Sequence, residues 1–242
     1  MFRKLFFVLL TGTLLAACNP VQTVSSVAAS TESPATAVQA VPSITLTDGL
    51  GRTVTLASPA QRVVSLAPSN TEILFAIGAG AQVIARDETS DYPAEVLTLP
   101  TIGGYGGFSL EAIVALHPDL VLAQGGGFNS PELVASLENL GLTVYVLPNP
   151  PTLEAMYTNL ETAGVLTGHG AEATALVESL KVRVVIVDEK ILPISFRPTV
   201  YYELDATEPT KPYTAGPGTF VDLLIARSGG INIGAELQGQ WP

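Results

Sequence analysis

The sequence predicts an α/β protein whose strands form parallel sheets. Short runs of β-branched and apolar residues alternate along the chain with longer segments that begin at a helix-capping residue and end at glycine or proline. Strands and helices that alternate in this way are typical of βαβ units, which place parallel strands side by side. Apolar residues make up 47% of the 242 residues and charged residues only 14%, which is enough apolar material for a sizeable core.

The N-terminus has the pattern of a secretion signal. Two basic residues precede an apolar run over residues 5–15, which is too short for the roughly 20 residues of a membrane helix. The run ends in Leu15-Ala16-Ala17-Cys18, which resembles the lipobox of bacterial lipoproteins, where the cysteine is lipidated. An ordinary signal peptide with a stray cysteine is the alternative. We expect residues 1–18 to be a lipoprotein signal and residues 19–42, rich in Ser, Thr, Pro, Ala and Val, to be a flexible tether.

Residues 43–170 contain the elements of one α/β lobe. Two alternating segments flank Asp48-Gly49 and predict a β-hairpin. Ser69 and Glu72 have the spacing of a capping box, which predicts a helix from Ser69 through Ile77. The remaining elements are, in order, strands at 44–47, 53–56, 62–66, 83–85, 120–123 and 143–147, and helices at 110–116, from Ser130-Pro131 to Gly141, and from Thr152 to about Leu166.

The next stretch, residues 171–192, fits two interpretations. Apolar residues spaced for one helical face favour a helix, whereas Val182–Val187 is β-branched and could form a strand. We favour one long helix ended by Pro193. Beyond it, the pattern predicts a strand at Thr199–Leu204, a helix at Phe220–Ser228 and a short strand at Ile231–Ile233. Residues 193–242 are few for an independent core, so we expect this second lobe to be incomplete.

Composition excludes several classes of function. The formal charge of −11 disfavours nucleic acid, whose phosphates need Lys and Arg. One cysteine excludes a disulfide framework and cysteine-based metal clusters, and two histidines, His117 and His169, leave little for a centre with several histidine ligands. We therefore expect no resident metal or cofactor.

Six fragments in order resemble one family. Arg62 to Gly78 (RVVSLAPSNTEILFAIG) is similar to the opening of the bacterial binding proteins for cobalamin and for ferric siderophores or haem. The other fragments of the family pattern are Ser90–Pro93, Ser109–Ile113, Pro118–Val121, Tyr213–Phe220, and Gly229–Ile233 with Trp241-Pro242. The resemblance is greatest to the cobalamin-binding branch. It implies two Rossmann-like lobes with central parallel sheets, joined by one long helix, with a ligand in the cleft between the lobes.

Ligands of open α/β sheets lie beyond the carboxyl ends of the strands. This rule places loops at 68–70, 89–92, 103–107, 124–128 and 213–216 around the cleft. The resemblance implies that Tyr105 and Trp241 are cleft aromatics that pack on a flat macrocycle. The predicted ligand-binding residues are Ser69, Asn70, Thr89, Tyr105, Gly125, Gly126, Tyr213 and Trp241.

A partner surface is predicted on the first lobe. Between Asp87 and Glu178 the chain holds twelve acidic residues and no Lys or Arg, a pattern that steers a protein towards a basic partner. The resemblance implies that Glu111 pairs with arginines of a membrane permease, although an acid in the first turn of a helix also complements the helix dipole.

We therefore expect a monomeric, extracytoplasmic, lipid-anchored binding protein that delivers a metal chelate to the permease and ATPase of an ABC importer. Cobalamin or another corrinoid is the first candidate ligand, and a ferric siderophore or haem is the alternative. A secreted hydrolase is a more distant possibility, but no Gly-x-Ser-x-Gly motif or Cys–His pairing points to one. A receptor for free metal ions and a structural adhesin are disfavoured by the two histidines and by the absence of short repeats.

Overall fold

The computed structural model describes residues 43–242. The predicted signal at 1–18, lipidation at Cys18 and the tether at 19–42 lie outside the described residues. Among the helices of residues 43–242, none combines the length and the apolar character needed to cross a membrane.

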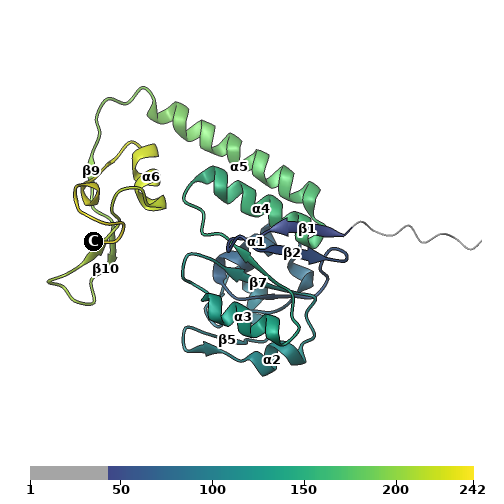
Figure 1. The fold of residues 1–242 in the computed structure, drawn as a ribbon. Coiled ribbons are helices and arrows are strands. Elements are labelled where there is room, and N and C mark those ends of the chain that lie inside the picture. The colour runs from purple at the N-terminus through teal and green to yellow at the C-terminus, as the bar shows by residue number, and fades with distance from the viewer. Residues whose placement is uncertain (1–42) are drawn as a thin grey trace, which may run out of the picture. The chain divides into compact units, whose positions relative to one another are not determined.

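The first lobe is built on a parallel four-stranded sheet, as predicted (Figure 1). Its strands are β3 (Val63–Ser65), β4 (Val83–Ala85), β7 (Leu120–Gln124) and β8 (Val144–Leu147), in the spatial order β4-β3-β7-β8. β3 pairs in parallel with both β4 and β7, and β7 pairs in parallel with β8. The α/β prediction from alternating strands and helices is therefore confirmed.

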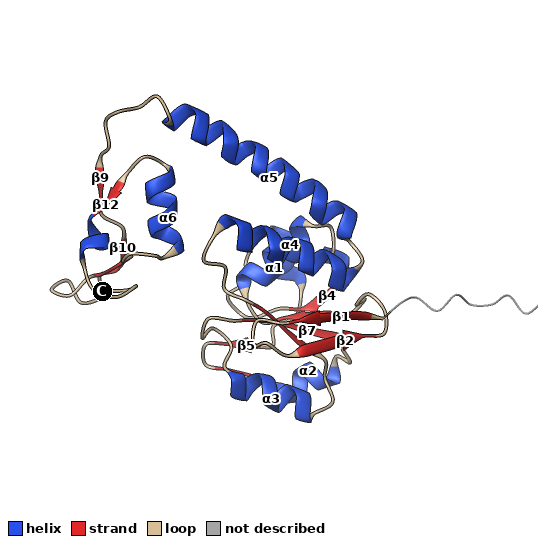
Figure 2. Cartoon of the chain, turned by 45° about the horizontal axis from the view of Figure 1, so that its top comes forward, coloured by secondary structure: helices blue, strands red, loops and turns tan. Residues whose placement is uncertain are grey.

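Helices cover both faces of this sheet (Figure 2). One layer holds α1 (Pro68–Ala76) and α4 (Leu153–Thr167), and the other holds α2 (Leu110–Ala115) and α3 (Pro131–Asn139). Three of these helices begin where the sequence predicts, because Ser109, Ser130 and Thr152 each accept a hydrogen bond from a backbone N–H in the first turn.

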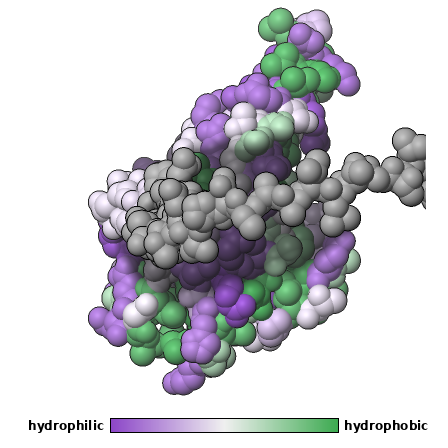
Figure 3. All heavy atoms as spheres, turned by 90° about the vertical axis from the view of Figure 1, so that its right-hand side faces the viewer, coloured by the Kyte–Doolittle hydropathy of each residue, from purple (hydrophilic) through white to green (hydrophobic). Residues whose placement is uncertain are grey.

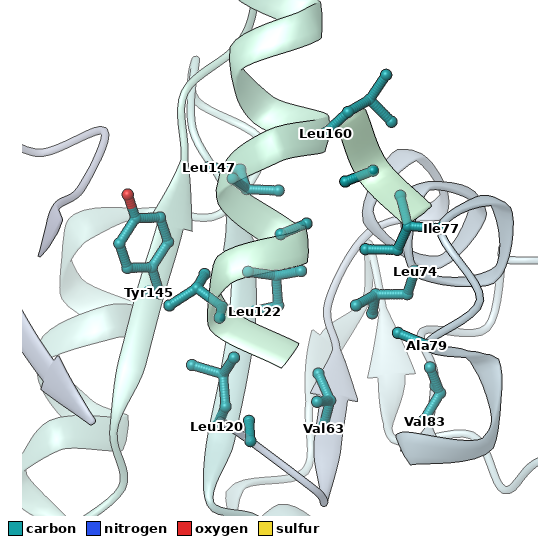
Figure 4. Close-up of a cluster of buried hydrophobic side chains, with 14 of the residues drawn as sticks. Val63, Leu74, Ile77, Ala79, Val83, Leu120, Leu122, Tyr145, Leu147 and Leu160 are labelled. Carbon is teal, nitrogen blue, oxygen red and sulfur yellow. The ribbon is translucent and has the colours of Figure 1, made fainter. Parts of the chain in front are cut away.

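Each face of the sheet packs its own apolar cluster. Figure 4 shows Val63, Leu120, Leu122 and Leu147 of the strands packing against Leu74 of α1, Ile77 at the end of α1 and Leu160 of α4. On the other face, strand residues such as Val64 and Val121 pack with Ile113, Val134 and Leu137 of α2 and α3. Burial on both faces explains why these strands read as continuous apolar runs rather than as alternating ones.

Two hairpins lie beside the central sheet. The predicted one pairs β1 (Ile44–Thr47) with β2 (Thr53–Leu56), with Ile44 opposite Leu56. The other pairs β5 (Gly103–Gly104) with β6 (Gly107–Phe108) and was not predicted, because its glycines carry no apolar alternation. Short 3₁₀ turns occupy η1 (Gly80–Gln82) and η2 (Ala94–Thr98).

A long helix, α5 (Gly170–Ile191), follows the first lobe. The helical interpretation of residues 182–187 is confirmed. Its buried Ala173 and Val177 join the apolar cluster that contains α4, and the ammonium of Lys181 lies 5.8 Å from the ring centroid of Tyr157 on α4. Apolar side chains also remain at the surface: Val182 is 59% exposed, and hydrophobic residues lie among hydrophilic ones on the face drawn in Figure 3.

The residues after α5 form small sheets and one helix. The elements are β9 (Thr199–Val200), β10 (Glu203–Asp205), β11 (Tyr213–Thr214), α6 (Phe220–Arg227), β12 (Ile231–Asn232) and η3 (Ile233–Glu236). β12 pairs in parallel with β9, and β10 pairs with β11 in antiparallel fashion. Thr219 caps α6 as predicted. The division into lobes at 43–170 and 193–242 stays a prediction.

Two local predictions are wrong. The helix α1 begins at Pro68, a favoured first residue, so Ser69 lies inside the helix and no side chain caps it; the capping box of Ser69 and Glu72 does not form. The single strand predicted at Thr199–Leu204 is broken after Val200, because only two residues of β9 find a partner in β12 and the chain then turns to pair with β11.

Candidate binding cleft

The strand order creates a crevice at the carboxyl edge of the sheet. β3, the first strand of this sheet along the chain, lies between the second and the third, β4 and β7. The connections that leave β3 and β7 therefore run to opposite faces, which is the arrangement that opens ligand crevices in doubly wound sheets. Ser69 follows β3 and Gln124 ends β7, and the hydroxyl of Ser69 donates to Oε1 of Gln124 at 3.0 Å across this point.

Three adjoining cavities lie along this edge. The largest, of about 740 Å³, is lined from the first lobe by Ser69, Glu72, Ile73, Gln124, Gly126, residues 149–151, Met156 and Asn159, and from the C-terminal segment by residues 218–220, Gln240 and Trp241. A second, of about 480 Å³, shares Ser69, Gln124, Gly126 and Asn149 with the first. It shares Tyr105 and Phe128 with a small third cavity of about 20 Å³. Because neighbouring cavities share lining residues, the three together are called the candidate cleft below.

The structure brings six of the eight predicted ligand-binding residues to these cavities. They are Ser69, Thr89, Tyr105, Gly125, Gly126 and Trp241. That they bind a ligand stays a prediction.

The other two lie elsewhere. Asn70 is fully buried, and its Nδ2 donates to the carbonyl of Leu122 at 3.1 Å, so it ties α1 to β7 instead of facing the cleft. Tyr213 is 53% exposed but lines none of the three cavities. The structure therefore does not bring these two residues to the three cavities, and their role in ligand binding stays a prediction.

The loop after β7 is held at both ends by Asn129. Its Oδ1 accepts a hydrogen bond from the backbone N–H of Gln124 at 2.7 Å, its own N–H donates to the Gln124 carbonyl at 3.1 Å, and its Nδ2 donates to the carbonyl of Leu66. Within the loop, Gly126 has a φ of +73°, a conformation that favours glycine. The loop thereby presents Gly125 and Phe128 to the cleft.

Aromatic rings stand at the mouth and at the far wall. Tyr105 is 81% exposed, and its ring lies edge-on to that of Phe128, with centroids 5.4 Å apart and an interplanar angle of 65°. Phe220 and Trp241 line the largest cavity from the C-terminal segment. Flat ligands can pack against such faces.

Asp87 positions the loop that carries Thr89. Its carboxylate is buried and accepts hydrogen bonds from the backbone N–H groups of Thr89 and Ser90, at 2.9 and 3.1 Å, and from both of their hydroxyls. The Ser90 hydroxyl also lies 2.9 Å from that of Thr71 on α1. A carboxylate satisfied in this way fixes the loop against the sheet.

Sequence reasoning missed part of the cleft. The loop 149–151 follows β8 and lies at the same edge as the other strand ends, so the rule that located the other loops also points to it. Phe220 and Gln240 carried no comparable signal, because their place depends on how the C-terminal segment packs.

The cleft carries no positive side chain. Among the residues that line the three cavities, none is Lys, Arg or His, and the charged ones are Glu72 and Asp87. Within residues 43–242, no group of His, Cys, Asp or Glu side chains is arranged to hold a metal ion. The lining therefore offers amides, hydroxyls, backbone groups and aromatic faces.

A further cavity of about 630 Å³ lies between α4, α5 and α6. Its lining is mainly apolar, with Leu153, Leu180 and Leu224 among its members. It shares Met156 with the cavity of about 740 Å³ but contains none of the predicted site residues.

A two-lobed α/β fold with a cleft at the strand ends is the architecture of a ligand-binding protein, and comparison with known proteins assigns the family. A family model described as "Periplasmic binding protein" matches residues 63–242. The chain belongs to this family, which consists of binding proteins and not of enzymes.

Individual relatives agree with this assignment. A cobalamin-binding protein of Halobacterium salinarum is 32% identical over 197 residues, which cover 80% of this chain and 52% of that protein. Among solved structures, the periplasmic vitamin B12-binding protein BtuF of Vibrio cholerae superposes with a TM-score of 0.65 at 29% identity, covering 76% of this chain and 70% of that one. The periplasmic heme-binding protein RhuT of Roseiflexus gives a TM-score of 0.66 at 27% identity, with the same coverage of both chains. The chain spans about half the length of the curated relatives that it matches, from 37% to 62% for the first three.

Proposed function

We propose that this protein captures a metal chelate outside the cytoplasm and delivers it to an ABC importer, and that the chelate is cobalamin or another corrinoid. The observation that carries the proposal is the set of adjoining cavities at the strand ends, whose lining combines aromatic rings with amide side chains. A broad, flat and partly apolar ligand fits this combination.

The charges of the cleft favour a corrinoid over ligands that carry carboxylates. The corrin periphery bears neutral carboxamides, which can exchange hydrogen bonds with side chains such as Gln124, Asn149 and Asn159. The propionates of haem would require cationic partners when buried, and the lining residues provide Glu72 and Asp87 instead. The cobalamin-binding relatives support the same choice.

Haem or a ferric siderophore is the second candidate, because the exposed phenol of Tyr105 is an oxygen donor that could ligate iron. The heme-binding neighbour supports this alternative. The two candidates differ in what they require of Tyr105. A corrinoid would use its ring face and would tolerate Tyr105→Phe, whereas ligated iron would lose its partner and be released.

Delivery requires a membrane partner. We propose that Glu111, exposed in the first turn of α2, contacts the permease and that a lipid on Cys18 holds the protein at the membrane surface. The acidic surface of residues 87–178 would attract a basic permease face. Replacement of Cys18 by Ser should release the protein from membrane fractions; retention would contradict the anchor.

The chain holds one tryptophan, Trp241, and it lines the largest cavity, so its fluorescence reports on the cleft directly. We propose titrating the purified protein with cyanocobalamin, haemin and a ferric hydroxamate siderophore. Quenching should be followed with inner-filter correction, and co-elution of each visible spectrum with the protein should be checked. Saturable binding of cyanocobalamin above the other two is the expected result. Binding of none of them would overturn the proposed function.

A further inference from the structure

We infer that Gln124 selects the ligand by donating a hydrogen bond to one of its carbonyl oxygens, and that Ser69 positions the Gln124 amide for this contact. The inference rests on the proposed function, because it names the group in the cleft that reads the ligand's polar periphery. It adds a specificity-determining residue that the sequence pattern did not single out.

Gln124 belongs to the lining of two of the three cavities of the cleft. It ends β7 at the point where the chain connections diverge, and it lines both the cavity of about 740 Å³ and the one of about 480 Å³. The residue is only 8% exposed, so its side chain is held by protein on most sides.

The contacts of Gln124 leave one group unused. Its backbone N–H and carbonyl are both bonded to Asn129, and its Oε1 accepts from the Ser69 hydroxyl at 3.0 Å. Within the described residues, Nε2 of Gln124 has no protein partner. This atom is also not fully enclosed by protein. The amide N–H groups are thus accessible donors on an otherwise fixed side chain.

A ligand that closes over this amide must supply an acceptor, because a donor that is buried without a partner opposes binding. The lining favours a neutral acceptor over an anion, since Glu72 lies in the same cavity and no cation does. The carboxamide carbonyls of a corrinoid have this chemistry. Ser69 determines which end of the amide faces the cleft, because its hydroxyl binds the oxygen end.

The test uses the isosteric variant Gln124→Glu. Ser69 can still donate to the carboxylate, so the local structure is retained while the donating amide is replaced by a second acceptor. We expect affinity for cyanocobalamin, measured by Trp241 quenching, to fall by about 10- to 100-fold. Gln61→Glu adds the same charge at an exposed position outside the three cavities and should leave affinity unchanged.

The positioning role of Ser69 needs a second pair of variants. Ser69→Ala frees the amide to rotate and should weaken binding by about 3- to 10-fold, since one oriented hydrogen bond is lost. Ser69→Thr keeps the hydroxyl and should restore most of the affinity, which a purely steric role would not predict. Thermal unfolding of each variant, without ligand, shows whether it remains folded.

The outcomes separate this inference from the proposed function. If the unmodified protein binds none of the three chelates, the proposed function fails. If it binds cyanocobalamin and Gln124→Glu binds equally well, the function stands and the role of Gln124 is overturned. Tighter binding by Gln124→Glu would also overturn it, because the side chain would then present an acceptor to the ligand.

Discussion

Asp48 and Arg52 form an ion pair that fastens the turn of the β1–β2 hairpin to the free edge of β8. The Asp48 carboxylate is fully enclosed and accepts hydrogen bonds from Nε of Arg52 at 3.0 Å and from the backbone N–H groups of Leu50 and Arg52, each at 3.0 Å. It also accepts from the N–H of Val146 on β8 at 3.3 Å. The turn therefore satisfies polar groups that an edge strand would otherwise expose.

Replacing Asp48 by Ala should lower the free energy of unfolding by about 2–4 kcal/mol, because several donors and the Arg52 charge lose their partner. Urea unfolding followed by circular dichroism measures this loss. Glu138→Gln is the matched control: it removes the other acidic partner of Arg52, but Glu138 is 45% exposed, so the change should stay below about 1 kcal/mol. Equal losses in the two variants would contradict the role of Asp48.

The Asp48 carboxylate should also make the stability of the protein depend on pH in the acid range. Burial acts to raise the pKa of Asp48, but the hydrogen bonds from Arg52 and Leu50 and the Arg52 charge outweigh it and hold the pKa below the ordinary value of 3.8. A group whose pKa is lowered by folding stabilises fully above its unfolded value, and this contribution disappears as the pH falls through the folded value. The stability difference between the protein and Asp48→Asn should therefore be constant at neutral pH and shrink below about pH 3.8. A constant difference throughout the acid range would contradict the pairing.

The sequence predicts those parts of the fold that depend on contacts between residues close together in the chain. The parallel sheet and the capped helices are predicted well, because Ser109, Ser130 and Thr152 act on backbone groups only three residues away. The start of α1 is predicted one residue too late, because Pro68 and Ser69 both favour a helix start and the Ser69 hydroxyl bonds to Gln124 instead of capping the helix.

Prediction of the cleft residues from the sequence is limited in the same way. The rule for strand ends finds the loops, but it does not tell which side chain of a loop faces inward. Asn70 and Ser69 are neighbours, yet one is buried against β7 and the other lines two cavities, because successive residues of a helix point in different directions. The β5–β6 hairpin, whose turn carries Tyr105, rests on glycine conformations that leave no apolar pattern.

Replacing Gly126 by Ala tests whether the loop after β7 shapes the cleft. A Cβ at this position would lie 2.7 Å from Cβ of Asn149, whereas a Cβ at Gly141, which lines none of the three cavities, would meet no atom within 4 Å. Both residues have positive φ, so Ala should cost each variant about 1–2 kcal/mol of stability. Only Gly126→Ala should also displace Asn149 and weaken chelate binding, by about 10-fold if one hydrogen bond is lost. Parallel titrations and unfolding curves separate the two effects, and equal affinities would exclude Asn149 from the site.

The edge-on pair of Tyr105 and Phe128 should act as a unit in ligand binding. Tyr105→Ala and Phe128→Ala should each weaken cyanocobalamin binding, and the double variant should lose less than the two losses combined. The expected coupling is about 0.5–1.5 kcal/mol, because each ring orients the other. Affinities from Trp241 quenching complete the double-mutant cycle. Strict additivity would mean that Phe128 contacts the ligand independently or not at all.

Glu111→Arg should reduce import of the chelate in cells while leaving its affinity for the purified protein near normal. Glu111 is exposed in the first turn of α2, so reversing its charge removes an acidic contact for a basic permease without reaching the cleft. Import is measured as uptake of labelled cyanocobalamin in cells that express the cognate permease and ATPase.

Glu132→Arg is the matched control for Glu111→Arg. Glu132 is also exposed and stands two residues after a capping serine, in the first turn of α3, so both substitutions remove a favourable interaction of an acid with a helix N-terminus. A general loss of stability or of negative charge would impair import equally in the two variants. A defect confined to Glu111→Arg would place the permease contact at α2, whereas weaker chelate binding by Glu111→Arg would assign Glu111 to ligand binding and contradict the docking role.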